Sequence, residues 1–338
     1  MAKKQFKAES KRLLDLMVNS IYTHKEIFLR EIISNASDAC DKLCYQALTD
    51  DSVGMSRKDF KIEIKVDKEH RTLTVSDNGI GMDKADLENN LGVIASSGSY
   101  KFKQEVGDDA KDTDVIGQFG VGFYSAFMVS DQITVVTKKY GAETAYTWAS
   151  SGADGYTITE GGREDVGTDI IMHIKPDTDD EKYSEFLESW RLQELVRKYS
   201  DYIRFPIRME VSKTRRKEGS PDDKPEYETY TEVETLNSMV PIWQRRKSSV
   251  KPEEYNKFYR DKFHDYADPQ KVIAVSAEGA VTYKALLFIP GAAPSTSTPK
   301  SMRRACSSTP TVSSLWTSVP TCCRTTSASS GAWWTLRT

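Results

Sequence analysis

The sequence predicts an α+β protein of more than one domain, and three observations support this prediction. Residues 25–47 place apolar side chains at helical spacing, which predicts a long amphipathic helix. Residues 61–66 and 72–76 alternate apolar and polar side chains, which predicts two strands, and the turn at 68–71 makes them a hairpin. At 338 residues, the chain is long enough for two domains with cores of their own.

Further elements follow in chain order. We expect a helix at 6–22, a helix opening near 122, and helices around 190–196 and 252–263. Further strands are expected at 132–138, 144–148, 167–174, 204–211, 271–276 and 281–289. Residues 213–226 are charged and contain Pro and Gly, so they are predicted to be a linker between an N-terminal domain at 1–212 and a second domain that starts at 227.

Composition excludes several classes of protein. A net charge of -3 with 29% charged residues is typical of an ordinary globular protein, so we expect no nucleic-acid partner. No apolar run approaches the roughly 20 residues of a membrane helix, and the first residues lack a secretory core, so a cytoplasmic protein without a membrane partner is expected. Five cysteines form no disulfide framework, and Cys40 and Cys44 are expected to pack within a helix rather than bind zinc.

A polar stripe runs along the predicted helix at 25–47. Its members are spaced by four, three and four residues, which places them within about 60° of one another on one flank: Glu31, Asn35, Asp38 and Lys42. Two carboxylates, an amide and an ammonium in this arrangement suit a cation and a polar ligand, although a solvated flank has the same pattern. The far side of the helix is expected to face solvent: Arg30, Ser34, Ser37 and Asp41.

Two glycine motifs follow the stripe. Asp77 ends a predicted strand, where its carboxylate could accept a hydrogen bond from an amine-bearing ring. Gly79 and Gly81 follow and permit a tight turn and close approach of a ligand, although many strand-to-turn junctions look alike. Glycines at 117, 120 and 122 precede a predicted helix, where free backbone N–H groups suit phosphate, although a structural turn would explain them equally well. They match neither the Walker nor the dinucleotide-binding pattern.

In their order along the chain, the three motifs resemble the ATP site of the gyrase, heat-shock chaperone, histidine kinase and mismatch-repair (MutL) superfamily. Residues 26–39, 76–82 and 116–125 resemble more closely the ninety-kilodalton heat-shock protein family in its bacterial HtpG form, as do residues 237–243. The resemblance covers residues 5 to about 294. It implies a two-layer α/β sandwich of the Bergerat type for the N-terminal ATPase domain, followed by the start of an α/β middle domain.

The resemblance also implies a function. It implies a chaperone of the heat-shock and stress response, which binds unfolded client proteins, hydrolyses ATP with Mg²⁺ and forms a homodimer in its full-length form. Glu31 would be the general base for the attacking water, and Asn35 would ligate Mg²⁺ at the phosphates. Asp77 would receive the adenine amino group with support from Thr168.

Other positions complete the site that the resemblance implies. Gly81 and Met82 would line the base pocket, Asn90 would contact the sugar-phosphate side, and Asp38 and Lys42 would form the wet edge. The phosphates would be cradled by seven residues: Gly117, Gln118, Phe119, Gly120, Val121, Gly122 and Phe123. Residues 91–120 would form a lid, in which Ser96 departs from the family's basic residue, so a phosphate contact there is not expected.

Two other functions fit the motifs. Another member of the superfamily is one: a sensor histidine kinase would need a phosphoacceptor helix, which none of the four histidines provides, and a topoisomerase or mismatch-repair protein would need DNA contacts. A non-catalytic nucleotide-binding module is the other.

The composition changes abruptly at Ser295. Of the last 44 residues, 21 are Ser or Thr and none is acidic, yet three of the five cysteines and three of the six tryptophans lie there. A disordered tail is one interpretation, but such tails rarely carry Trp and Cys. We favour a reading-frame shift near residue 294, because codons that encode residues 316–324, moved by one base, can encode a phrase resembling the family's middle domain. This polypeptide would then lack the family's γ-phosphate arginine and its dimerisation domain, so we expect ATP binding, weak turnover and no stable dimer.

Overall fold

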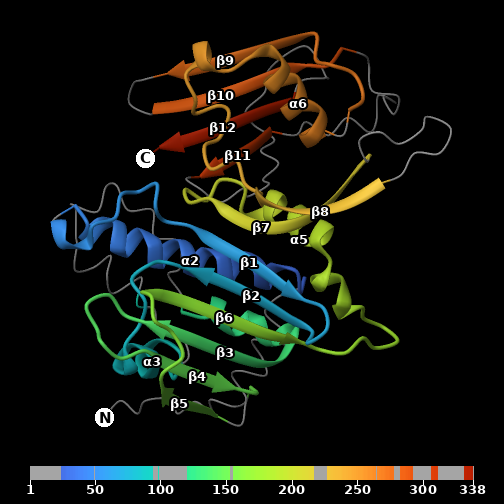
Figure 1. Cartoon of the computed structure of the whole chain (residues 1–338). Helices are drawn as coiled ribbons and strands as arrows, with labels where there is room; N and C mark the ends of the chain where they lie inside the picture. The colour runs from blue at the N-terminus through green and yellow to red at the C-terminus, as the bar shows by residue number, and fades with distance from the viewer. Residues whose placement is uncertain are drawn as a thin grey trace, which may run out of the picture. The chain divides into compact units, whose positions relative to one another are not determined.

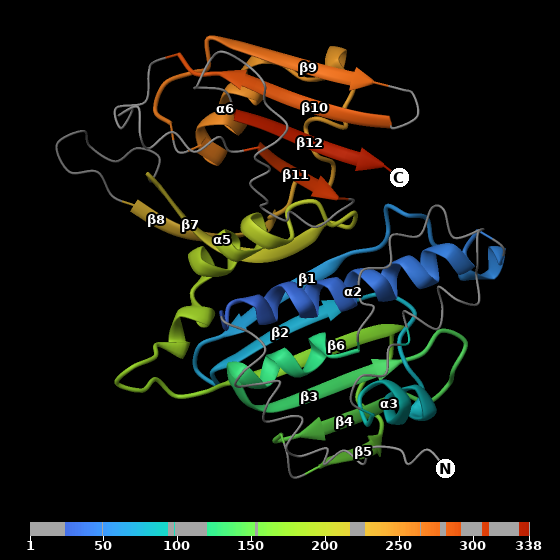
Figure 2. The same cartoon turned by 180° about the vertical axis from the view of Figure 1, so that it is seen from behind.

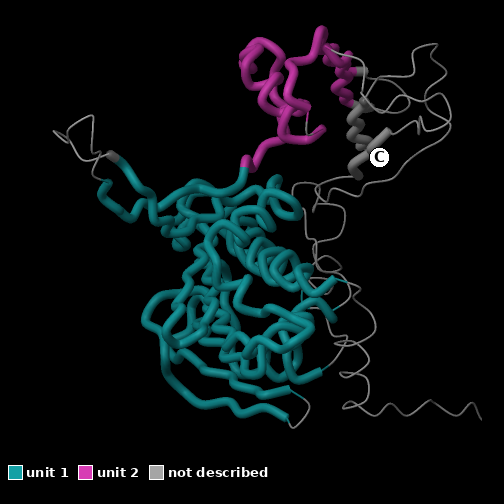
Figure 3. The backbone as a smooth tube through the Cα atoms, turned by 90° about the vertical axis from the view of Figure 1, so that its right-hand side faces the viewer, with its two compact units in different colours: residues 1–237 teal, residues 238–338 magenta. Residues whose placement is uncertain are grey.

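The computed structural model describes most of the chain as two compact units, residues 1–237 and 238–338 (Figure 3). The described residues are 24–48, 50–93, 98, 120–152, 155–216, 227–263, 265–277, 282–291, 306–310 and 331–337. The helix expected at 6–22 therefore lies outside the described residues.

Unit 1 is built on an eight-stranded sheet with the order β5-β4-β3-β6-β2-β1-β7-β8. Its strands are β1 Ile62–Asp67, β2 Thr72–Asp77, β3 Ser130–Lys138, β4 Tyr146–Ser150, β5 Tyr156–Glu160, β6 Gly167–Ile174, β7 Ile207–Arg216 and β8 Tyr227–Thr235. All neighbours are antiparallel except β1 and β7, which run parallel. The sheet is therefore mixed, and β1 and β2 form the predicted hairpin.

Helices cover one face of this sheet. They are α2 Ile27–Gln46, η2 Asp51–Val53, α3 Lys84–Asn90, η4 Gly122–Met128, η5 Tyr183–Leu187 and α5 Ser189–Tyr199. Figures 1 and 2 show α2, α3 and η4 on the same side of the strands. Phe28 and Ile32 on α2 are fully buried, together with Met172 on β6, so the main core lies between the two layers. The predicted two-layer arrangement is confirmed.

Helix α2 is more deeply buried than its periodicity predicts. Ser34, Ser37 and Asp41 are buried and Arg30 is half-buried, so the prediction that this side faces solvent is wrong. Helix α2 contacts η4 and α5 as well as the sheet, so more than one of its sides is packed. Burial raises the pKa of Asp41 to about 6, against the opposing charge of Arg204.

Three other segments differ from their predictions. The edge strand β5 was not predicted, although Tyr156 and Ile158 alternate with Thr157 and Thr159, and its residues are mostly exposed. The helix expected near residue 122 is the short 3-10 helix η4. Residues 213–216 of the predicted linker end β7, which pairs with β8, and residues 217–226 lie outside the described residues. The two units divide after Asn237, later than the predicted linker.

Strands β7 and β8 continue past the rest of the sheet as a two-stranded ribbon. Strand β1 pairs with β7 only at residues 207–209, whereas β8 pairs with β7 along its length. Charges of opposite sign face each other across the ribbon. Arg215 Nε lies 2.5 Å from Glu228 Oε1, and Lys213 Nζ lies 3.1 Å from Glu232 Oε2.

Unit 2 has a four-stranded sheet with the order β11-β12-β10-β9. Its elements are η6 Lys247–Ser249, α6 Pro252–Phe263, β9 Lys271–Ala277, β10 Thr282–Ile289, β11 Cys306–Pro310 and β12 Gly331–Arg337. Phe288 on β10 packs against the rings of Phe258, Tyr259 and Phe263 on α6. Strands β11 and β12 belong to the Ser/Thr-rich tail and pair with each other in parallel. Among the described residues of both units, no helix is long and apolar enough to span a membrane.

Candidate functional site

The polar stripe predicted on α2 is present and partly enclosed. Glu31, Asn35 and Lys42 are half-buried, whereas Asp38 is only 1% exposed. The apolar positions between them face the core, which fixes the stripe along one flank of the helix. The turn after Asp77 contacts this helix at Ala39, and the start of η4 contacts it at Glu31. The two glycine motifs therefore lie at different points along the stripe.

Asp77 closes one end of the site. It is the last residue of β2, opposite Thr168 of β6, and it is 5% exposed. Its Oδ1 accepts a hydrogen bond from the backbone N–H of Gly79 at 2.9 Å. Burial raises the pKa of Asp77 to about 7, while the N–H groups of Gly79 and Thr168 and the charge of Arg163 oppose this rise. This carboxyl therefore titrates near neutral pH.

The turn after Asp77 is locked between α2 and β3. The N–H of Ile80 donates to the carbonyl of Ala39 at 3.0 Å, and a Cβ at Gly79 would lie 2.4 Å from the carbonyl carbon of Ala39. Gly81 has a φ of +67°, and a Cβ there would lie 2.0 Å from the carbonyl oxygen of Lys138. Both glycines are therefore required by close backbone approach.

Thr137 on β3 is a site residue that the sequence reasoning missed. It is fully buried, and its Oγ1 accepts a hydrogen bond from the N–H of Met82 at 2.9 Å. The same oxygen lies 3.0 Å from Oγ1 of Thr168 and 3.1 Å from the carbonyl of Gly167. Thr137 thus joins the predicted pocket residues Met82 and Thr168. A signal was present, since Thr137 is in phase with the apolar residues Ile133 and Val135 on the buried face of β3.

The predicted phosphate segment meets α2 at Glu31. Gly120 has a φ of +64°, Val121 follows, and η4 begins at Gly122. A Cβ at Gly122 would lie 2.5 Å from Oε2 of Glu31, so the start of η4 rests against this carboxylate. Phe123 is buried in the core beneath it.

Part of the predicted phosphate segment and most of the predicted lid lie outside the described residues. These positions are Gly117, Gln118, Phe119 and Ser96, and the lid at 91–120 is described only at 91–93, 98 and 120.

Glu31 is engaged in an ion pair. Its Oε1 accepts hydrogen bonds from Nε of Arg30 at 3.0 Å and from Nη2 of Arg30 at 2.5 Å. The Glu31 side chain is 23% exposed and the Arg30 side chain 38% exposed. Both partners of this ion pair are therefore accessible to solvent.

Lys42 on α2 lies among acidic residues of the predicted site and of α3. Burial lowers its pKa, and the charges of Asp38, Asp86 and Asp77 oppose this shift, which places three carboxylates near one ammonium. Asp86 lies on α3, which starts with a capping box at Asp83.

Asn90 is the last residue of α3. A Cβ at Gly98 would lie 2.9 Å from its Oδ1, so Asn90 borders the described part of the predicted lid.

The donor set at this site can be tested against Mg²⁺. Within the described residues, no group of three or more His, Cys, Asp or Glu side chains is arranged to hold a metal ion. The predicted ligand, Asn35, is half-buried on α2 one turn from Glu31 and supplies an amide oxygen. This fits an ion such as Mg²⁺, which takes few protein ligands and completes its octahedron with phosphates and water.

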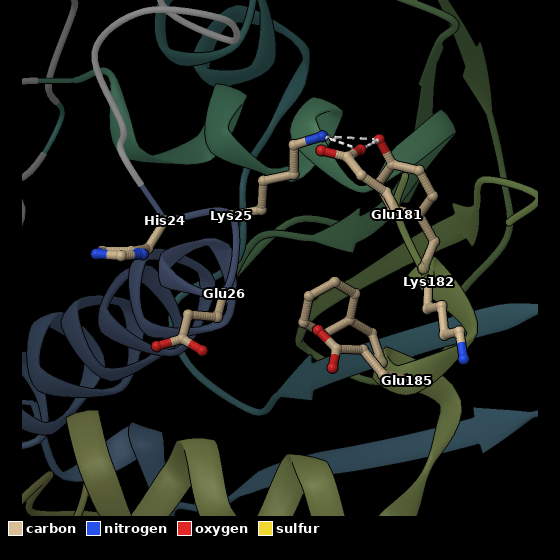
Figure 4. A pocket seen from close by; sticks show the side chains of 8 residues that line it. His24, Lys25, Glu26, Glu181, Lys182 and Glu185 are labelled. Atoms are coloured by element: carbon tan, nitrogen blue, oxygen red, sulfur yellow. Dashed lines mark hydrogen bonds and ion pairs between the residues drawn. The ribbon is translucent and has the colours of Figure 1, made fainter. Parts of the chain in front are cut away.

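A separate cavity of about 250 Å³ lies at the N-terminal end of α2 (Figure 4). None of the predicted site residues lines it. Lys25 Nζ donates to Tyr183 Oη at 2.8 Å and pairs with Glu181, while Glu26 pairs with Arg191 at 2.6 Å. These ion pairs tie the start of α2 to η5 and α5, so Lys25, Glu26 and Glu181 already have partners within the protein.

Comparisons with known protein families divide the chain into two matched regions. The model described as "Histidine kinase-, DNA gyrase B-, and HSP90-like ATPase" matches residues 22–156, which include α2, the turn after Asp77 and η4. The model described as "Hsp90 protein" matches residues 185–229 and 220–307.

Curated relatives match most of this chain. A protein named "Chaperone protein HtpG" from Clostridium botulinum (strain Langeland) is 56% identical over 295 residues, which is 87% of this chain and 46% of the relative. A protein of the same name from Clostridium acetobutylicum is 57% identical over the same shares. Another from Halalkalibacterium halodurans is 56% identical over 86% of this chain and 46% of its own length. The chain thus spans about half the length of the relatives it matches.

Proposed function

Because the chain belongs to the Hsp90 family, with the ATPase domain that this family shares with histidine kinases and DNA gyrase B, we propose that it binds and hydrolyses ATP as part of a chaperone. The observation that carries the proposal is the course of the polar stripe on α2. One helix flank leads from Glu31 beside Gly122 to Asp38 and Lys42 near Asp77. A nucleotide lying along this flank meets a buried acceptor at one end and a carboxylate at the other.

In this proposal the purine end of the nucleotide meets Asp77. An ionised Asp77 accepts a hydrogen bond from the adenine amino group, and a buried acceptor of this kind rejects rings that cannot donate there. Thr168 stands opposite Asp77, and Thr137 holds Thr168 and the peptide of Met82 in place. Gly81 lets the chain pass close to Lys138 on β3, where a side chain would not fit.

The phosphate end is proposed to lie between Glu31 and the start of η4. Glu31 acts as general base: it orients the attacking water and takes its proton once Arg30 has turned away. Backbone N–H groups from Gly120 to Phe123 bind phosphate oxygens, and Asn35 holds Mg²⁺. When bound, the metal neutralises the charge that develops on the phosphates.

We propose that the polypeptide of this sequence binds ATP but hydrolyses it slowly. Its composition departs from the family's after residue 294, where the resemblance implies an arginine that reaches the γ-phosphate. Such an arginine accelerates phosphoryl transfer by orders of magnitude, so hydrolysis by this polypeptide is proposed to be slow. Binding of unfolded clients and a cytoplasmic location are proposed from the family.

Two variants test the assignment. ATP is titrated calorimetrically, with MgCl₂ present, into the unmodified chain, Glu31→Ala and Asp77→Asn, and phosphate release is then measured. Glu31→Ala is expected to keep the ATP dissociation constant within about 3-fold and to lose turnover by about 100-fold or more, since a general base contributes that much. Asp77→Asn is expected to weaken binding by about 100-fold or more, because the amide presents a donor in a site built for an acceptor.

Two results would contradict the proposal. One is an unmodified chain that shows no affinity for ATP. The other is Glu31→Ala losing binding as severely as Asp77→Asn, which would show that the two roles are wrongly assigned.

A non-catalytic nucleotide-binding module is the second candidate function. The ion pair between Arg30 and Glu31 favours it, because the proposed base already has a partner. ATP binding without measurable phosphate release, unchanged by Glu31→Ala, would select it.

A further inference from the structure

Arg163 lies directly behind Asp77, outside the set of residues assigned to the nucleotide. It belongs to the loop that precedes β6, and its side chain is only 15% exposed. Its Nη2 donates to the backbone carbonyl of Asp77 at 3.1 Å, and its Nε donates to the carbonyl of Asp165 at 3.0 Å. Its Nη1 lies 2.6 Å from Oδ1 of Asp169 as an ion pair. One guanidinium therefore binds the end of β2, its own loop and β6.

The backbone leaves room for this arrangement at Gly167. This residue has a φ of +126°, and a Cβ there would lie 2.2 Å from the carbonyl oxygen of Asp77 and 2.9 Å from Nη2 of Arg163. A side chain at this position would push the arginine away from the carbonyl that it binds. The close approach of β6, β2 and the Arg163 loop thus depends on glycine here.

The charges around Asp77 come from three elements. Arg163 is the cation that most opposes the effect of burial on Asp77, and Asp169 on β6 acts in the opposite direction. From α2, the thiol of Cys40 and the ammonium of Lys42 also face Asp77. Because burial disfavours the charged form of Asp77, the arginine and the N–H of Gly79 together favour its ionised form.

We propose that Arg163 is a positioning residue for nucleotide binding, which fixes the end of β2 through the carbonyl of Asp77 and keeps the adenine-binding carboxyl ionised. This inference rests on the proposed function, since it takes Asp77 as the acceptor for adenine. It adds a requirement that the motifs do not contain: the acceptor needs a buried cation behind it. Arg163 itself does not touch the nucleotide.

Three variants test this role through the pH dependence of ATP binding. ATP dissociation constants are measured by calorimetry between pH 6 and pH 9 for the unmodified chain, Arg163→Gln, Asp169→Asn and the control Lys68→Gln. Lys68 is a surface cation that pairs with Glu188, away from the site. Comparison among variants cancels the titration of ATP itself. Circular dichroism and thermal unfolding report whether each variant is folded.

Opposite shifts are expected for the two charge variants. Arg163→Gln keeps an N–H donor but loses the charge, so the midpoint of the binding profile should move up by about one pH unit, with about 5- to 10-fold weaker binding at pH 7 and recovery above pH 8.5. Asp169→Asn removes the opposing charge and should move the midpoint down. Lys68→Gln should leave the midpoint unchanged.

The outcomes separate this inference from the proposed function. If the unmodified chain does not bind ATP, the proposed function fails. If it binds and Arg163→Gln has the same profile, or loses affinity equally at every pH, the inference is overturned. If Arg163→Gln does not fold, the direction of the shift in Asp169→Asn decides, because a merely structural loss would not lower the midpoint.

Discussion

The two ends of the proposed nucleotide site are built differently. At the purine end, Asp77 and Thr168 stand on neighbouring strands and are nearly inaccessible, and Thr168 contacts the hydroxyl of Thr137. At the phosphate end, Glu31 stands on a helix flank, is partly exposed and is paired with Arg30. The purine end is therefore fixed by the sheet, whereas the proposed catalytic carboxylate is partly exposed and paired with an exposed side chain. This difference indicates that affinity and hydrolysis can be altered separately.

Substitution of Gly81 should damage the purine end most. Gly81→Ala places a Cβ 2.0 Å from the backbone oxygen of Lys138 at a φ of +67°, so the turn must move. We expect a loss of about 3 kcal/mol or more in the free energy of unfolding, with ATP binding lost. Gly141→Ala is the matched control, because it has a φ of +78° with no atom within 4 Å and should cost about 1 kcal/mol. Equal costs in urea unfolding would show that the turn is not confined.

Loss of the Thr137 hydroxyl should have a smaller effect at the same end. Thr137→Val keeps the shape of the side chain but leaves the N–H of Met82 without its acceptor. We expect a cost of about 1 to 3 kcal/mol in stability and about 10-fold weaker ATP binding. Thermal unfolding and calorimetry check both values. Unchanged affinity with reduced stability would show that the Thr137 hydroxyl supports the fold but not the pocket.

A substitution at the phosphate end should change turnover with little effect on stability. Gly122→Ala brings a Cβ to 2.5 Å from the end of the Glu31 side chain, which is flexible and can move aside. We expect phosphate release about 10-fold slower, with the ATP dissociation constant within about 3-fold of the original.

A double variant shows whether this effect acts through Glu31. Gly122→Ala combined with Glu31→Ala should be no slower than Glu31→Ala alone. An additional loss in the double variant would mean that Gly122 acts on the phosphates directly.

Local patterns predicted much of unit 1. Strand β6 has the predicted bounds at 167–174, because it alternates and begins after a glycine. The stripe on α2 and the turn at Gly79 and Gly81 were predicted because spacing along a helix and backbone freedom are properties of short segments. The resemblance extended these patterns to residue roles.

Contacts between distant segments were not predictable in the same way. Arg163 reaches Asp77 across 86 positions in the chain, and neither residue's neighbours indicate the other. Thr137 resembles an ordinary strand residue until the sheet order places β3 beside β6. The side of α2 that was expected to face solvent was misjudged for the same reason. Its periodicity predicts one packed face, whereas α2 contacts α5 and η4 as well as the sheet.

Strand β8 is the last strand in the order of the eight-stranded sheet, and edge strands of this kind invite pairing with other chains. In β8 three acidic residues occupy positions along this edge: Glu228, Glu232 and Glu234. An identical strand brought alongside would place these carboxylates next to their own copies, and the resulting like-charge repulsion would be offset only by the ion pairs of Glu228 with Arg215 and of Glu232 with Lys213. The charged pattern thus discourages stacking of copies into fibrils, and concentrated salt would weaken this protection.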